Sequence, residues 1–219
     1  MSHSWPWLTL ALLGAYHGLN PAMGWLFAVA LGLQEQRRGV VLQALPPIAL
    51  GHATAVLLAV MVIGVAQIVV PLDVLRYVCA GVLILFGLYK LVRRRHPRWV
   101  GMRVGFRDLT AWSFLMATAH GAGLMLIPVL LRLSFTEQMH GAHVHGAHTD
   151  PAAMIGSATV LADLAAVGLH TLALFAVMSV IALVVYEKLG VMILKSTWFN
   201  LDLLWAGALL GAGLITLVV

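Results

Sequence analysis

Four histidines stand inside long apolar stretches of the sequence, where an ionisable side chain is costly. They are His17, His52, His120 and His170. Neutral imidazole is a good ligand for nickel, cobalt, zinc and copper, and it can also relay protons. A hydrogen bond to neighbouring backbone explains any one of them equally well, but four in one chain favour a shared function. The sequence therefore predicts a transition-metal site built from these four side chains.

The stretch "GAYHGLNPAMGW" places three further polar or soft groups next to the first histidine. Pro21 has no N–H to donate to the carbonyl of His17, so we expect the helix to break here and leave that carbonyl for a ligand or water. Asn20 lies one turn from His17 on the same face and is expected to assist at the site. Met23 follows as a soft ligand. A packing kink is the alternative reading.

The segment around His120 also contains residues that are expected to interrupt a helix. Gly121 and Gly123 follow that histidine, as Gly18 follows His17, and Pro128 comes one to two turns later. Interrupted helices near the middle of a membrane are where many transporters bind their substrates.

Asp163 is the one carboxylate that stands well inside an apolar stretch. It precedes His170 by seven residues, two helical turns, and so lies on the same helix face. We expect it to neutralise a cation or to carry a coupling proton.

A second group of histidines falls in a polar loop, "MHGAHVHGAHTD". The loop contains His140, His143, His145 and His148 among glycines and alanines, a composition typical of metal capture. A solvated loop without function and an acid-sensing loop are the alternatives.

The elements that hold these residues are membrane helices. Of the 219 residues 62% are hydrophobic and 10% are charged, which predicts an integral membrane protein. The length suits about six spans of roughly 20–25 residues. We expect them at about Trp7–Leu33, Pro46–Val70, Leu72–Val92, Leu109–Leu133, Ile155–Tyr186 and Leu201–Val219.

The charges predict the topology. With these spans almost all basic residues fall on one side, which is then cytoplasmic. They are Arg37, Arg38, Lys90, Arg93, Arg94, Arg95, Arg98, Arg103, Arg107, Lys188 and Lys195. Both termini and the histidine-rich loop are then outside the cell or periplasmic, and the net charge of +5 reflects topology, with no nucleic-acid partner expected.

The two halves of the sequence resemble each other. "AYHGLNP" corresponds to "TAHGAGL", "GHATAVLLAVMV" to "GLHTLALFAVMS", and "LDVLRYVCAGVLILFGL" to "LDLLWAGALLGAGLITL". These matches pair His17 with His120 and place His52 within one residue of His170. Because each half has three spans, an odd number, the halves must cross the membrane in opposite orientations, as in many secondary transporters.

Other classes are disfavoured. The single cysteine, Cys79, permits neither a disulfide framework nor a dithiol relay. The sequence has no GxxxxGK[ST] motif for ATP and no HExxH motif for an intramembrane protease, so no enzyme is expected. We also expect no tightly bound cofactor. The glycines Gly207, Gly211 and Gly213 can pack helices within one chain or between copies, which leaves a homo-oligomer open.

The motif "HGLNPAM", followed by "GHATAVLLAV", resembles the pattern of the nickel/cobalt exporter family in the lysine-exporter superfamily. His17, Gly18, Leu19, Pro21 and His52 match that pattern. Asn20 and Met23 replace an acidic residue and a second histidine. The resemblance implies membrane transport of a divalent metal and leaves open which metal is carried.

These observations together predict an all-α integral membrane protein with six transmembrane helices in a 3+3 inverted repeat. We expect one transmembrane domain over residues 1–219, with repeat one at 7–92, a cytoplasmic basic loop at 93–108, and repeat two at 109–219. The histidine-rich loop at 134–154 lies within repeat two.

The expected function is proton-coupled transport of nickel, cobalt, zinc or copper across the inner membrane. Two alternatives remain: a b-type haem protein with paired histidine ligands, and a transporter of a small organic or anionic substrate.

Overall fold

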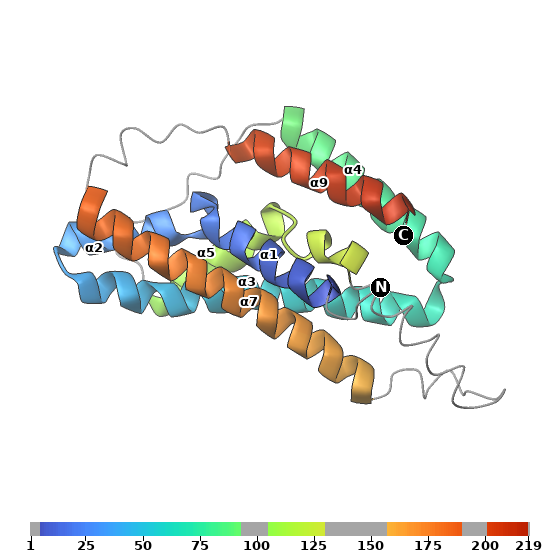
Figure 1. Cartoon of the computed structure of the whole chain (residues 1–219), viewed down its shortest axis with the longest axis horizontal. Helices are drawn as coiled ribbons and strands as arrows, with labels where there is room; N and C mark the ends of the chain where they lie inside the picture. The colour runs from blue at the N-terminus through green and yellow to red at the C-terminus, as the bar shows by residue number, and fades with distance from the viewer. Residues whose placement is uncertain (1–4, 93–104, 130–156, 190–200, 219) are drawn as a thin grey trace.

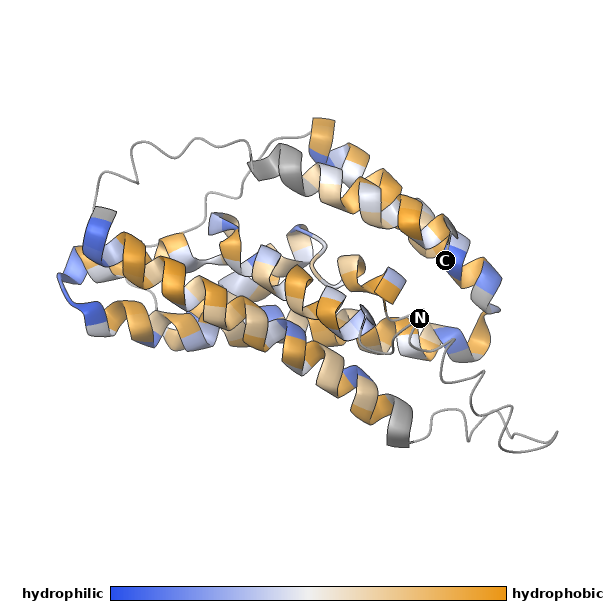
Figure 2. Cartoon of the chain, in the orientation of Figure 1, coloured by the Kyte–Doolittle hydropathy of each residue, from blue (hydrophilic) through white to orange (hydrophobic). Residues whose placement is uncertain are grey.

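The computed structural model describes residues 5–92, 105–129, 157–189 and 201–218, and all regular structure within these ranges is helical (Figure 1). Three helices are long and apolar enough to cross a membrane, over Arg38–Gln67, Asp73–Val92 and Val160–Lys188. Shorter apolar helices cover Trp25–Glu35 and Ala206–Leu217. The prediction of an all-α, membrane-spanning architecture is thus confirmed in its coarse form (Figure 2).

The first predicted span is a broken helix. Helix α1 (Trp5–Leu19) is followed by a 3₁₀ turn, η1 (Pro21–Met23), and by helix α2 (Trp25–Glu35). The break falls at the predicted proline, but the expectation that the carbonyl of His17 is left for a ligand is wrong. The N–H of Asn20 donates to it at 3.1 Å, because the chain tightens into an i to i+3 bond just before the proline.

Two side chains stabilise the ends of this break. Asn20 is the N-cap of η1, and its Oδ1 accepts from the N–H of Ala22 at 3.0 Å. The indole Nε1–H of Trp25 donates to the carbonyl of Leu19 at 3.1 Å, which satisfies one of the last carbonyls of α1.

Helix α3 (Arg38–Val69) begins earlier than predicted, and Pro46 and Pro47 lie inside it. These prolines remove the N–H groups that would pair with the carbonyls of Leu42 and Gln43. Leu42 and Gln43 are exposed in the second turn of the helix, close to its polar end. Water can donate hydrogen bonds to their two carbonyls there. His52 therefore lies about 21 Å from the start of its helix, whereas a start at Pro46, as predicted, would place it only about 9 Å from that end.

Helix α4 (Leu72–Val92) has the predicted bounds, and the tight turn before it is at Val70–Pro71. Helix α5 (Phe106–Ala119) ends just before His120, and a turn leads into a second 3₁₀ segment, η2 (Leu124–Leu126). Gly121 has a φ of +69°, in the left-handed region that favours glycine. The predicted interruption after His120 is therefore present.

The last described elements are α7 (Ser157–Val184), a π-helical turn, η4 (Val185–Leu189), and α9 (Leu201–Val218). They agree with the fifth and sixth predicted spans within two or three residues. The histidine-rich loop and most of the basic loop lie outside the described residues.

The long helices pack in three pairs: α1 runs parallel to α7, α3 runs parallel to α5, and α4 runs antiparallel to α9 (Figure 1). Glycines let two of these pairs approach closely. A Cβ atom at Gly14 or Gly18 of α1 would collide with the carbonyl of His170 or Leu174 on α7. A Cβ atom at Gly51 of α3 would collide with the carbonyl of Thr110 on α5.

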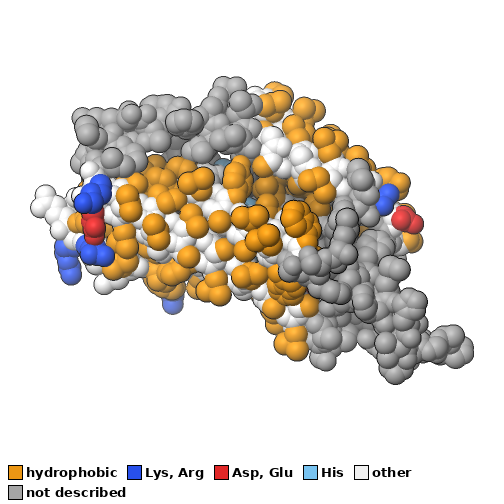
Figure 3. Space-filling model, in the orientation of Figure 1, with side chains coloured by type: hydrophobic (Ala, Val, Ile, Leu, Met, Phe, Trp, Pro, Cys, Tyr) orange, Lys and Arg blue, Asp and Glu red, His pale blue; other side chains and the backbone are white. Residues whose placement is uncertain are grey.

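The surface of the visible face is apolar in its middle, and charged side chains gather toward its two ends (Figure 3). At one end Arg38 forms an exposed ion pair with Glu187, with Nη1 and Oε1 3.0 Å apart. Asp73 and Arg76 belong to the first turns of α4, next to the Pro71 turn. An apolar belt between polar ends is the surface expected of a protein embedded in a membrane.

Candidate functional site

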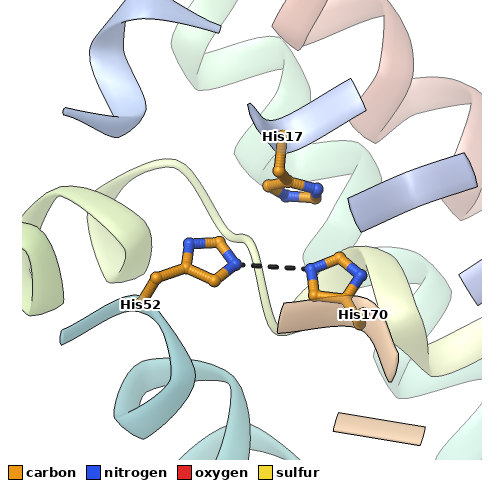
Figure 4. Close-up of side chains that lie close together, drawn as sticks. All are labelled: His17, His52 and His170. Carbon is orange, nitrogen blue, oxygen red and sulfur yellow. Dashed lines mark hydrogen bonds between the residues drawn. The ribbon is translucent and has the colours of Figure 1, made fainter. Parts of the chain in front are cut away.

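Three of the four predicted histidines meet inside the helical bundle. His17 comes from α1, His52 from α3 and His170 from α7, and the three rings face one another (Figure 4). One ring nitrogen from each lies within 4.8 Å of the other two. The ring centroids are 5.2 Å apart for His17 and His52, 4.9 Å for His17 and His170, and 5.5 Å for His52 and His170.

Backbone carbonyls orient two of these rings. The Nδ1–H of His17 donates to the carbonyl of Leu13 at 2.7 Å, and the Nδ1–H of His170 donates to the carbonyl of Leu10 at 3.3 Å. A carbonyl can only accept, so each facing nitrogen carries the proton and the lone pair is on Nε2. Metal-binding histidines commonly make this second bond, because it fixes both the tautomer and the ring orientation.

The third histidine is held by the second one. The Nε2 atoms of His52 and His170 are 3.3 Å apart. Two nitrogens that bind one tetrahedral ion at about 2.0–2.1 Å are separated by about 3.3–3.4 Å. The pair therefore has the spacing of two ligands on one edge of a tetrahedral site.

All three rings are excluded from solvent, with 0%, 1% and 0% of His17, His52 and His170 exposed. Polar groups buried in this way are costly unless they bind something. A cation held by the three nitrogens would satisfy them together.

His120 is also buried but does not belong to the three-histidine group that the described residues form. It follows α5 directly, and its Nδ1–H donates to the carbonyl of Met116 at 2.7 Å. The carbonyl is four residues back, as for His17 and Leu13, so the two rings are anchored in the same way. His120 is close enough to His17 for the two to interact electrostatically.

The remaining predicted ligands have other surroundings. Asn20 uses its side-chain oxygen as the cap of η1. Met23 is buried in an apolar cluster with Leu83, Met125 and Leu209. Asp163 is half-buried on α7, about 10 Å along the helix from His170, and is not part of the histidine group. Their roles in metal binding stay predictions.

The glycines predicted to weaken the helices have two functions. Gly121 adopts the left-handed conformation of the second break. Gly18 and Gly123 serve close packing, since a Cβ at Gly18 would lie 2.5 Å from the carbonyl of Leu174 and one at Gly123 would collide with Ala59.

Sequence reasoning missed the groups that position the rings. The carbonyls of Leu10, Leu13 and Met116 carry no sequence signal of their own, although the spacing of four residues was available for the last two. Ser113 was also missed. Its hydroxyl donates to the carbonyl of Ile48 at 2.6 Å and thereby joins α5 to α3 one turn before His52.

Comparison of the chain with protein-family models, with curated proteins and with solved structures gives no match.

Proposed function

We propose that this protein is a secondary transporter that carries a transition-metal cation across the membrane, with His17, His52 and His170 as the substrate site. The observation that carries the proposal is the meeting of three buried imidazoles from three different helices, with the lone pairs of His17 and His170 on Nε2. Three imidazoles leave a fourth coordination position of a tetrahedral cation for water, so the cation is held less completely than in a closed structural site with four protein ligands.

The donor set bears on which cation is carried. Imidazole suits zinc, copper, nickel and cobalt, whereas magnesium and calcium prefer oxygen ligands. Met23 packs in an apolar cluster with Leu83, Met125 and Leu209, and the proposal uses the three imidazoles without a soft sulfur ligand of the kind that favours copper(I). We favour zinc, cobalt or nickel in the divalent state.

The proposal includes the 3+3 inverted repeat. Exchange of the two halves maps α1 onto α5, α3 onto α7 and α4 onto α9. The same exchange turns the α1–α7 pair into the α5–α3 pair and leaves the α4–α9 pair as it is, and these are the three extensive pairs of the fold. The breaks after His17 and His120 and the matching ring anchors support the same relationship.

The haem alternative is less well supported. A haem iron lies between two axial imidazoles at about 2 Å from each, with the porphyrin plane between the rings. The 3.3 Å between Nε2 of His52 and Nε2 of His170 is too short for that arrangement, and the rings would have to separate.

The test is metal content of purified protein. His140, His143, His145 and His148 are first replaced by alanine together, so that the loop cannot bind metal. This protein is dialysed against Zn²⁺, Co²⁺ or Ni²⁺ and is expected to hold one ion per chain. His52→Ala and His170→Ala in the same background are expected to hold none.

Three outcomes would count against the proposal. A Soret band in the purified protein would favour haem. Equal metal content in the parent and in both variants would place the ion elsewhere. No metal in the parent would favour the organic or anionic substrate. Elution as a single folded species is the control for each variant.

A further inference from the structure

The repeat relates the four buried histidines in two pairs, but the histidine group contains both members of one pair and only one member of the other. The halves pair His17 with His120 and His52 with His170, because each histidine follows its partner by 103 or 118 residues in matching segments. His52 and His170 contact each other, as two residues exchanged by a twofold axis can. Yet His17 belongs to the group with them and His120 does not.

A second difference between the halves also involves α1 and α5. The Nδ1–H of His170 donates to the carbonyl of Leu10 on α1. The same offset of 103 residues maps Leu10 onto Ser113 of α5, so the counterpart acceptor for His52 is the carbonyl of Ser113. In the described part of the chain Nδ1 of His52 is buried and has no hydrogen-bond partner. Ser113 is nearby, since its hydroxyl bonds Ile48 one turn before His52.

Both differences concern the contacts that α1 and its counterpart α5 make with His52 and His170. In α1 the ring of His17 and the carbonyl of Leu10 both engage His52 or His170. In α5 the ring of His120 lies outside the three-histidine group of the described residues, and the carbonyl of Ser113 does not accept from Nδ1 of His52.

We propose that this structure is one of two pseudo-symmetric states, and that His17 and His120 alternate as the third ligand of the cation. His52 and His170 hold the cation in both states. In the other state His120 joins them, the Nδ1–H of His52 donates to the carbonyl of Ser113, and His17 and Leu10 withdraw. The inference rests on the proposed function and adds the step that moves the cation.

The local structure supports such an exchange. Each alternating histidine is fixed to its own helix by a 2.7 Å bond to the carbonyl four residues back, so ring and helix move together. Each helix ends at a break, after Leu19 or after Ala119, and so can shift without moving the segment beyond it. His17 and His120 are also close enough to interact electrostatically.

The test uses asparagine, whose side-chain N–H can keep the bond to the carbonyl four residues back while the ligand nitrogen is removed. The loop-alanine protein described above is the parent, and Zn²⁺ binding is measured by equilibrium dialysis. His17→Asn and His120→Asn should each keep one ion per chain, with affinity weakened by no more than about tenfold, because one competent state remains. The double variant should bind more than about 100-fold more weakly.

Two controls define the pair that stays bound. His52→Asn and His170→Asn should each lose the ion as single variants, since both states need them. In vesicles, His17→Asn and His120→Asn should both abolish Zn²⁺ transport although they bind it, because the hand-over needs both ligands.

Two results would overturn the alternation. If His17→Asn loses the ion as completely as His52→Asn does, the site is a fixed triad. If His120→Asn transports at the parental rate, His120 is not a ligand in any state. Failure of the proposed function is distinct from these, because the parent itself would then bind no Zn²⁺.

Discussion

The three imidazoles of the site are positioned mainly by backbone. His17 and His170 each donate to a carbonyl of α1, and His52 is held through His170. The sequence predicted which histidines matter because a repeated ionisable residue in an apolar segment is a strong signal. It could not predict that three of them form one group and His120 does not, because that depends on where each broken helix lies against its neighbours.

Trp25 is the residue that best isolates one contact of the broken helix. Trp25→Phe keeps an aromatic ring in the buried site and removes the hydrogen bond from the indole N–H to the carbonyl of Leu19. We expect the protein to lose about 0.5–1.5 kcal/mol of stability. The measurement is the midpoint of thermal unfolding in detergent.

The matched control is Trp5→Phe, because Trp5 is 63% exposed at the start of α1. It should leave the midpoint unchanged within error. An equal shift in both variants would show that loss of the larger ring, and not of the cap, causes the effect.

Helices α1 and α7 pack closely because Gly14 leaves room for the carbonyl of His170. In Gly14→Ala the added methyl must push α1 away from α7, which strains the packing by about 1–3 kcal/mol. It should also draw His17 away from His170 and weaken Zn²⁺ binding. Unfolding midpoint and Zn²⁺ affinity are the two measurements.

Gly168→Ala on α7 is the control for this variant, since nothing lies within 4 Å of a Cβ there. A helical glycine replaced by alanine in open space gains about 0.5–1 kcal/mol, so the control should be slightly more stable. Unchanged Zn²⁺ affinity in Gly14→Ala would mean that the α1–α7 distance does not set the geometry of the site.

The second break depends on Gly121, whose φ of +69° suits glycine. Gly121→Ala places a methyl in the left-handed region at a cost of about 1–2 kcal/mol, and that methyl would lie 3.0 Å from Cε1 of Phe86. We expect slower transport with nearly normal Zn²⁺ binding, because the turn after His120 is strained while His17, His52 and His170 are untouched. Gly211→Ala, in open space on α9, should transport normally.

Helix boundaries were predictable where a proline marks the end or the break of a helix. The Pro71 turn gave α4 its bounds, and Pro21 gave the first break. The same rule fails at Pro46 and Pro47, because it predicts that α3 starts at these prolines and they lie inside the helix. A proline near the polar end of a membrane helix leaves carbonyls that water can reach, so the helix continues through it.

On its visible face the molecule has an apolar belt between two polar ends (Figure 3), and its long helices pack in three pairs. Three long helices show that the chain can span a membrane, and the side that faces the cytoplasm is a separate question. The positive-inside rule predicts that the end with Arg37 and Arg38 is cytoplasmic. One exposed position shortly before α3 and one just after it can test this orientation.

Cysteines at Gln34 and at Pro71 report on the two ends, after Cys79 is replaced by serine. Gln34 is exposed near the end of α2, beside the basic residues, and Pro71 is exposed in the turn between α3 and α4. An impermeant thiol reagent added to intact cells should label Pro71→Cys and should label Gln34→Cys only after the membrane is opened. The reverse pattern would place the basic end outside, against the charge bias. Labelling of both in intact cells would contradict a membrane-spanning α3, because its two ends would then face the same solution.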